Sequence, residues 1–205
     1  MAKTTLSTIF ASGRPSRCQS GFTLLEVLVA IIVLSFGVLG AVGLQAASLQ
    51  ANKEARNQSA AVRLGRELGD MMRGNKDVAI LTSTAANPYL VPNFTSASTL
   101  PSAPEDCSSA ACTTATTVAQ FQIRDWLSRV RSELPGARVV ICVDSAPYDD
   151  SAGLPTWACT NTGGMSVVKV GWTRQSTDRA ATAASAVDQA SVPAVVLPLI
   201  PGSAT

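Results

Sequence analysis

Residues 22–44 read FTLLEVLVAIIVLSFGVLGAVGL, an apolar run that contains one charged side chain, Glu26. The next charge along the chain is Lys53. An α-helix rises about 1.5 Å per residue, so this run would span about 34 Å, enough to cross a hydrocarbon core of about 30 Å. The sequence therefore predicts a membrane-spanning helix over residues 22–44.

The segment before this run is basic. Residues 1–21 contain Lys3, Arg14 and Arg17 and no acidic residue. Because basic flanks stay on the cytoplasmic side of a membrane, this segment is predicted to be cytoplasmic and the rest of the chain to be translocated. A chain without residues 1–21 would hold 13 basic and 14 acidic residues, a net charge of −1.

The composition supports one buried core and excludes several functions. The chain has 205 residues, of which 46% are hydrophobic and 15% are charged. Histidine is absent, which excludes histidine-dependent catalytic dyads and triads and the imidazole ligand of zinc. The formal charge of +2 gives no support to a nucleic-acid-binding surface, so we expect no nucleic-acid partner.

Residues 21–30 read GFTLLEVLVA and follow the basic segment directly. This combination resembles the N-terminal signature of type IV prepilins and of type II secretion pseudopilins. The resemblance implies that residues 1–21 are a leader peptide and that a prepilin peptidase cleaves between Gly21 and Phe22. It also implies that the new N-terminus, Phe22, is methylated and that Glu26 is the glutamate used in subunit assembly.

The chemistry of Glu26 fits the last role. A carboxylate inside a membrane helix costs about 2.5–3.5 kcal/mol on insertion scales, so such a group usually has a partner or a function. The Phe22 ammonium of a neighbouring subunit is a suitable partner, because opposite charges attract more strongly in a low dielectric than in water. Such a pair would set the axial register of an assembly. The alternative is an acid tolerated near the lipid headgroups.

Two other interpretations of the N-terminus compete with the prepilin signature. A conventional secretory signal is cleaved after its apolar stretch at a small-x-small site, which residues 44–47 (LQAA) fit poorly. A plain single-span anchor leaves the Gly21-Phe22 step and the lone Glu26 unexplained.

Helical spacing continues beyond the predicted span. Ala61, Leu64, Leu68 and Met71 form an apolar stripe, and Gly74-Asn75 is typical of a helix C-terminus. We expect one helix from Phe22 to about Arg73, in which residues 45–74 are amphipathic and lie across a globular domain formed by residues 75–205. Glycines at positions 37, 40 and 43 fit either close helix–helix approach or a segment that unwinds on assembly.

Residues 75–205 mix helical and strand patterns. Ile123, Leu127, Val130 and Leu134 have the spacing of a second helix over residues 118–134, which Pro135-Gly136 would stop. The other predictions are a loop over 76–117, strands over 138–144, 157–160 and 166–174, a hairpin turn at 161–164, an exposed stretch over 175–191 and an edge strand or packed tail over 192–200. In the strand over 166–174, Val168, Val170 and Trp172 should share one face.

The predicted fold class is α+β, with a long N-terminal helix packed on a small antiparallel sheet and a short second helix. This arrangement is similar to the pilin architecture. Residues 118–174 also resemble the minor pilins called PilV, the type IV pilus modification proteins. The resemblance lies in the order of a Trp-containing helix, a Cys-bearing strand, a loop with a second Cys and a Val-rich strand.

Cys18 lies in the predicted leader, and Cys107, Cys112, Cys142 and Cys159 lie on the predicted translocated side. An even number there indicates disulfides, with three possible connectivities. Sequence proximity favours Cys107–Cys112 and Cys142–Cys159. A zinc site made of the four thiolates is the alternative, although its spacings fit zinc ribbons poorly.

No catalytic or metal motif stands out. Asp144, Asp149 and Asp150 lack the spacing of a calcium-binding EF-hand loop, so a solvated turn is the preferred interpretation. The phosphate-binding, C-x-x-C and H-E-x-x-H patterns are absent. We therefore expect a protein without cofactor or metal that is not an enzyme.

These features predict a PilV-like minor pilin of a type IV pilus, which acts in pilus assembly or priming and in twitching motility. It would sit in the inner membrane with its C-terminal domain in the periplasm, and later in the filament on the cell surface. The implied partners are prepilin peptidase, other minor and major pilins, the inner-membrane assembly platform and, before assembly, membrane lipid. The alternatives are a type II secretion pseudopilin and a DNA-uptake or adhesion pilin.

Overall fold

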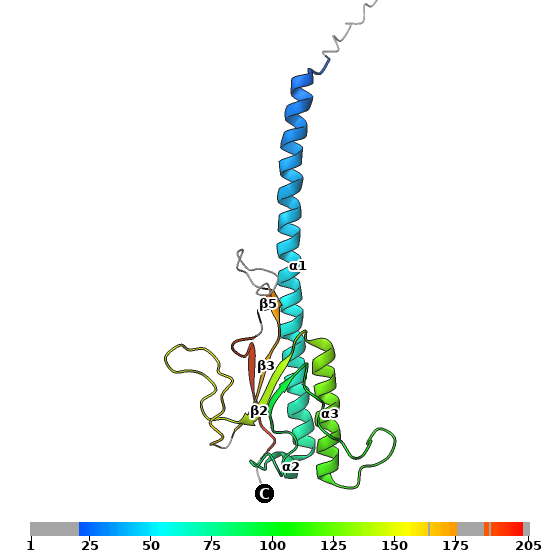
Figure 1. The fold of residues 1–205 in the computed structure, drawn as a ribbon, viewed down its shortest axis with the longest axis vertical. Coiled ribbons are helices and arrows are strands. Elements are labelled where there is room, and N and C mark those ends of the chain that lie inside the picture. Colours follow the sequence, from blue (N-terminus) through cyan, green and yellow to red (C-terminus); the bar gives the residue numbers. More distant parts are fainter. Residues whose placement is uncertain (1–20, 164, 176–186, 189, 203–205) are drawn as a thin grey trace, which may run out of the picture. The chain divides into compact units, whose positions relative to one another are not determined.

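The longest element is helix α1, Leu24–Gly74 (Figure 1). The structure is a computed structural model, which describes residues 21–163, 165–175, 187–188 and 190–202. The chain divides into two compact units, residues 1–48 and 49–205. The helix expected from Phe22 to about Arg73 is thus confirmed to within two residues.

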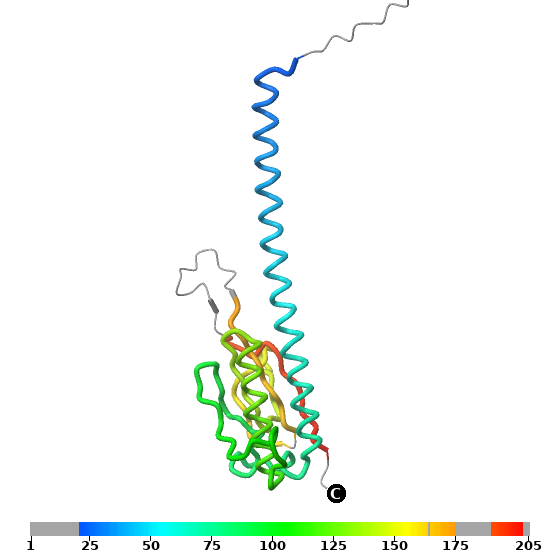
Figure 2. Tube along the Cα trace, turned by 90° about the vertical axis from the view of Figure 1, so that its right-hand side faces the viewer, coloured from blue at the N-terminus to red at the C-terminus, as the bar shows by residue number. Residues whose placement is uncertain are grey.

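The second unit contains a four-stranded antiparallel sheet with strand order β1-β2-β3-β6. The residues of α1 beyond position 48 and helix α3 lie side by side against one face of this sheet (Figures 1 and 2). The α+β class predicted from the sequence is therefore correct. The remaining elements are α2 (Lys76–Ala79), β1 (Val91–Thr95), α3 (Ala115–Glu133), β2 (Arg138–Val143), β3 (Ser166–Gly171), β4 (Arg174–Gln175), β5 (Val187–Asp188) and β6 (Val195–Leu199).

The main core lies between the two helices and the sheet. From α1 it takes Leu64, Leu68 and Met72, and Met71 is only partly buried. The predicted apolar stripe was wrong at Met71. Met72 lies eleven residues after Ala61, about three turns at 3.6 residues per turn, and therefore shares the buried face with Ala61. The other members are Ile123, Trp126, Leu127 and Val130 of α3 and Val139, Ile141, Val168 and Val170 of the sheet, with Trp172 just beyond β3.

Hydrogen bonds fix the helices on one another. Trp126 Nε1 donates to the carbonyl oxygen of Leu64 at 2.9 Å, which ties α3 to α1 inside the core. The N-terminus of α3 is capped by Thr114, whose hydroxyl accepts from the backbone N–H of Thr117. Such a cap is worth about 1 kcal/mol and explains why α3 begins three residues before its first expected position.

Both edge strands of the sheet contain a proline, Pro92 in β1 and Pro198 in β6. Proline cannot donate to the ladder and is tolerated at edges, so the edge strand expected within residues 192–200 is confirmed. The loop expected over residues 76–117 was partly wrong, because it contains α2 and β1. Phe94 of β1 is 2% exposed because it is buried in the main core, and β1 is hydrogen-bonded to β2 as an antiparallel neighbour.

The predicted strand over residues 157–160 was wrong, and so was the hairpin turn that would have followed it. The connection from β2 to β3 holds no strand in its described residues, only an isolated bridge between Tyr148 and Pro155. The disulfide between Cys159 and Cys142 of β2 holds this segment against the face of the sheet, so the segment does not pair with the edge of a strand. The exposed stretch expected over residues 175–191 lies mostly outside the described residues.

Candidate functional site

The first candidate site is the start of α1. The hydroxyl oxygen of Thr23 accepts a hydrogen bond from the backbone N–H of Glu26 at 3.2 Å, and the carbonyl of Thr23 accepts the first helical bonds. Thr23 is thus the N-terminal cap, and the helix begins at Leu24. The Gly21–Phe22 bond lies in exposed, non-helical backbone, where Phe22 is 82% exposed. A peptidase can approach a bond in this conformation.

Glu26 lies four residues after Phe22, a distance of about one helical turn along the chain. Both residues line a shallow groove of about 430 Å³, whose other walls are Val27, Ala30, Ile31 and Leu34. Glu26 forms no ion pair with any other described residue. Its carboxylate is thus exposed on an otherwise apolar surface, next to the residue that would become the N-terminus.

The rest of the first unit has the properties of a membrane segment. Among the described residues, α1 is the helix long and apolar enough to cross a membrane by length and composition. Every side chain from Gly21 to Lys53 is exposed. A Cβ added at Gly37, Gly40 or Gly43 would meet no atom within 4 Å, so no contact within the described chain requires glycine at these positions.

Comparison with known families bears on this segment. Residues 16–42 match the prokaryotic N-terminal methylation motif. This motif indicates a prepilin-type protein. In general it implies processing by a prepilin peptidase and assembly with other pilins, and together with the apolar helix it fits a membrane-anchored, structural pilin. No curated protein and no solved structure matches the chain.

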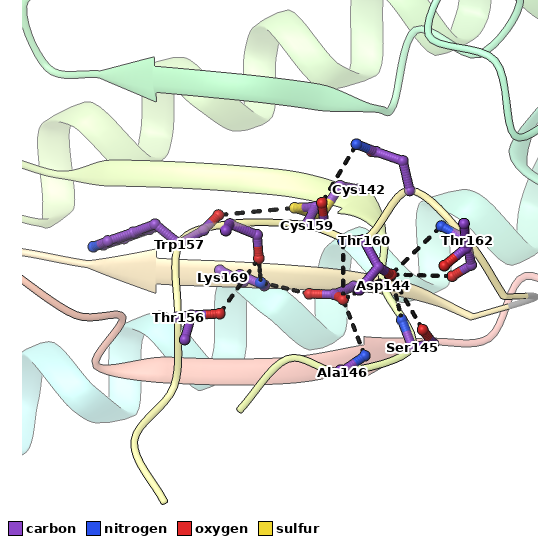
Figure 3. A network of polar contacts seen from close by, with 12 residues as sticks. Cys142, Asp144, Ser145, Ala146, Thr156, Trp157, Cys159, Thr160, Thr162 and Lys169 are labelled. Atoms are coloured by element: carbon purple, nitrogen blue, oxygen red, sulfur yellow. Dashed lines mark hydrogen bonds and ion pairs between the residues drawn. A yellow bond between two sulfur atoms is a disulfide. The ribbon is translucent and has the colours of Figure 1, made fainter. Parts of the chain in front are cut away.

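The second candidate site is on the outer face of the sheet, the face opposite α1 and α3 (Figure 3). There Lys169 Nζ lies 2.6 Å from Asp144 Oδ2, and both side chains have no exposed area. Lys169 also donates to the carbonyl of Ala158 at 2.5 Å. The other carboxylate oxygen accepts from the backbone N–H of Ala146 and from the N–H and hydroxyl of Thr160.

This environment changes the titration of Asp144. Burial acts to raise its pKa, but the hydrogen bonds from Lys169, Ala146 and Thr160 outweigh burial and hold the pKa below its usual value. The solvated turn expected for Asp144 was therefore wrong. Asp149 does match that expectation, since it is exposed and its carboxylate accepts from the N–H groups of Ser151 and Ala152.

The two disulfides are Cys107–Cys112 and Cys142–Cys159, the pairings that sequence proximity favours. The sulfur atoms of Cys142 and Cys159 and the Asp144 carboxylate lie within 4.8 Å of one another. A disulfide sulfur is not a thiolate ligand, and Lys169 already neutralises the carboxylate. This cluster therefore holds the 157–160 segment on the sheet and does not have the donors of a metal centre.

Sequence reasoning gave no role to Lys169 or Arg138 on this outer face, and it placed Trp157 in a strand. The Arg138 guanidinium lies over the Trp157 ring, 4.3 Å from its centroid. The ring lies against Gly171, where an added Cβ would come within 2.9 Å of it. The signal available was the alternation of strands β2 and β3, which places Arg138 and Lys169 on the face opposite Val139, Ile141, Val168 and Val170.

Proposed function

We propose that the chain is the prepilin form of a minor subunit of a type IV pilus. In this proposal a prepilin peptidase removes residues 1–21 and methylates Phe22, and the mature subunit leaves the inner membrane to enter a filament. The observation that carries the proposal is the methylation motif over residues 16–42, together with a helix that starts three residues after the scissile bond. Its partners would be the other pilins and the inner-membrane assembly platform.

Glu26 has the assembly role in this proposal. Its carboxylate lies on the same apolar groove as Phe22 and has no partner among the described residues of its own chain. A neighbouring subunit's Phe22 ammonium would supply the opposite charge in an apolar setting, where the attraction is strong. The globular residues beyond the membrane segment would then present the surface that primes or modifies the pilus, with their domain in the periplasm before assembly.

The first experiment is the intact mass and N-terminal sequence of the protein from membranes and from sheared surface filaments. We expect residues 22–205 with one added methyl group in both fractions. A chain that still starts at Met1, or one cleaved after residue 44, would overturn the proposal. Presence in the membrane fraction alone, with loss of exoprotein secretion in a deletion strain, would indicate a type II secretion pseudopilin instead.

Replacement of Glu26 tests its role separately from processing. Glu26→Ala should be cleaved and methylated normally, but its amount in sheared filaments should fall by about tenfold or more, because an ion pair that offsets burial of a charge in lipid is worth more than about 1.4 kcal/mol. Glu26→Gln should show the same loss if charge is what matters. Ser35→Ala, on the same exposed helix surface, is the matched control and should assemble normally. Wild-type amounts of Glu26→Ala in filaments would contradict the proposed register role.

The assignment to the PilV group is the finer part of the proposal. It is supported by the order of α3 with Trp126, β2 with Cys142, the loop with Cys159 and the valine-rich β3. A deletion strain that loses surface pili and twitching motility while keeping secretion would support it. Retained twitching would leave the prepilin assignment in place and remove the PilV one.

A further inference from the structure

A hollow of about 420 Å³ lies beside the end of the sheet where β2 begins. Its wall comes from residues 95–97 after β1, residues 136–138 at the start of β2, and Thr173 and Ala190. The pairing of Thr95 with Arg138, and of Arg138 with Gly171, brings these segments to one level of the sheet. The volume is within the range of small-molecule sites, about 300–1,000 Å³.

Arg138 supplies the positive charge of this hollow. Its guanidinium is held over the Trp157 ring, and Trp157 is itself fixed because its Nε1 donates to the carbonyl of Ala190 at 3.1 Å. Arg138 forms no ion pair with a described residue, and its Nε is buried without a hydrogen-bond partner among them. No described residue therefore balances the Arg138 charge, and an anionic ligand in the hollow would supply the opposite charge.

The rest of the wall offers hydroxyl groups on a floor without bulky side chains. Thr95, Ser96 and Thr173 are lining residues. The Thr95 hydroxyl is hydrogen-bonded to the Ser98 hydroxyl and the Ser96 hydroxyl donates to the carbonyl of Ala137, whereas that of Thr173 makes no hydrogen bond within the described chain. Gly136 has a φ of +57°, and a Cβ at this position would collide with Thr173 Oγ1. Glycine at position 136 therefore leaves the space that the Thr173 hydroxyl occupies.

We propose that this hollow binds a carboxylate-bearing monosaccharide, such as a uronic acid unit of an acidic polysaccharide. A guanidinium binds a planar carboxylate through two parallel hydrogen bonds, and Arg138 lines the hollow without an ion pair to a described residue. The Thr173 hydroxyl would exchange hydrogen bonds with ring hydroxyls of the sugar, and the hydroxyl oxygens of Thr95 and Ser96 keep lone pairs that can accept from them. The proposal does not depend on pilus assembly, because the site lies entirely in the second unit.

Saturation-transfer NMR on the full-length chain in detergent micelles tests this proposal directly. The probes are glucuronate, glucose and N-acetylaspartate, which separate the carboxylate from the sugar ring. We expect binding of glucuronate, with glucose and N-acetylaspartate each weaker by about tenfold. Equal binding of glucose would overturn the role of the carboxylate. Equal binding of N-acetylaspartate would overturn the choice of a sugar and indicate a peptide carboxylate.

Three variants locate the binding. Arg138→Gln should weaken glucuronate binding by about tenfold or more, since it removes the charge and the guanidinium while keeping a polar side chain. Thr173→Val keeps the shape of the side chain, removes one hydroxyl and should weaken binding several-fold. It tests the site independently if Arg138→Gln releases Trp157 and unfolds this end of the sheet. Arg66→Gln, at an exposed arginine of α1, is the matched control and should bind normally. Unchanged binding in both Arg138→Gln and Thr173→Val would overturn the site.

Discussion

Lys169 lies in the middle of β3 with no exposed side-chain area, although lysine is among the residues least often buried. Its charge is tolerated because Asp144 lies opposite and the Ala158 carbonyl accepts a second hydrogen bond. Both partners of this ion pair are needed, since removal of one leaves an uncompensated charge in the sheet. The pair therefore sets which segment can cover the outer face.

Asp144→Asn should lower the free energy of unfolding by about 3–5 kcal/mol at pH 7, because it leaves the Lys169 ammonium buried without a counter-ion. The double variant Asp144→Asn/Lys169→Met should recover part of this loss. The measurement is urea unfolding of the full-length chain in detergent, followed by tryptophan fluorescence. Unfolding of Asp144→Asn at the wild-type urea concentration would show that the pair contributes nothing.

The same pair gives a defined pH dependence. The folded pKa of Asp144 is lowered, so its contribution to stability is present above the unfolded value of about 3.9 and is lost as pH falls through the folded pKa. The wild-type chain should therefore lose this contribution only below about pH 4. The difference in stability between wild type and Asp144→Asn should be constant from pH 7 to pH 5 and shrink in stronger acid.

At the scale of elements, the two disulfides differ in what they hold. Cys142–Cys159 closes an 18-residue loop and fixes the 157–160 segment against Val140 and Val167 on the outer face. Cys107–Cys112 closes a six-residue loop in an exposed connection. Loop-closure entropy makes the longer bridge the more stabilising one.

On the chain-entropy model, loss of the Cys142–Cys159 bridge costs about 3 kcal/mol and loss of the Cys107–Cys112 bridge about 2 kcal/mol. Replacing Cys142 and Cys159 by serine also removes packing on the sheet, so this variant should lose more than about 3 kcal/mol, and the Cys107/Cys112 variant about 2 kcal/mol. Each double variant is the control for the other in the same denaturation series. A larger loss from the Cys107/Cys112 variant would contradict the assigned roles.

Elements with a strong local pattern were predictable, and those fixed by distant contacts were not. The apolar spacing of α1 and α3 and the valine runs of β2 and β3 identified these elements. The short strand β1 was missed because Pro92 argues against a strand, and only the burial of Phe94 in the main core reveals it. The segment at Trp157 has a strand-like composition, and the bridge to Cys142, seventeen residues away, decides its place.

The candidate sites also differ in whether their residues are close together in the sequence. The Gly21, Phe22 and Glu26 motif is local, so sequence alone located it, although its roles in cleavage, methylation and assembly stay predictions. The Lys169–Asp144 pair and the Arg138 hollow join residues from different strands and loops. Alternation places Arg138 and Lys169 on the outer face, but what covers them depends on the loop that the disulfide holds.

At the scale of the whole molecule, the division at residue 48 has a physical basis. No side chain from Gly21 to Lys53 is buried. The tertiary contacts of α1 begin at Glu54, whose carboxylate accepts a hydrogen bond from Trp172 Nε1 at 3.0 Å and pairs with Arg174 at 2.9 Å. The core of the second unit therefore needs none of the apolar segment for its own burial.

A fragment of residues 49–205 should accordingly be soluble without detergent, elute as a monomer and unfold cooperatively, because it keeps the whole core and the Glu54 contacts. A fragment of residues 61–205 keeps the core but leaves Trp172 Nε1 without its acceptor, and should be less stable by about 1–3 kcal/mol. Size-exclusion chromatography and thermal unfolding by circular dichroism compare the two. Aggregation or non-cooperative unfolding of the longer fragment would mean that residues before 49 contribute to the fold, and equal stability of the two would remove the role given to Glu54.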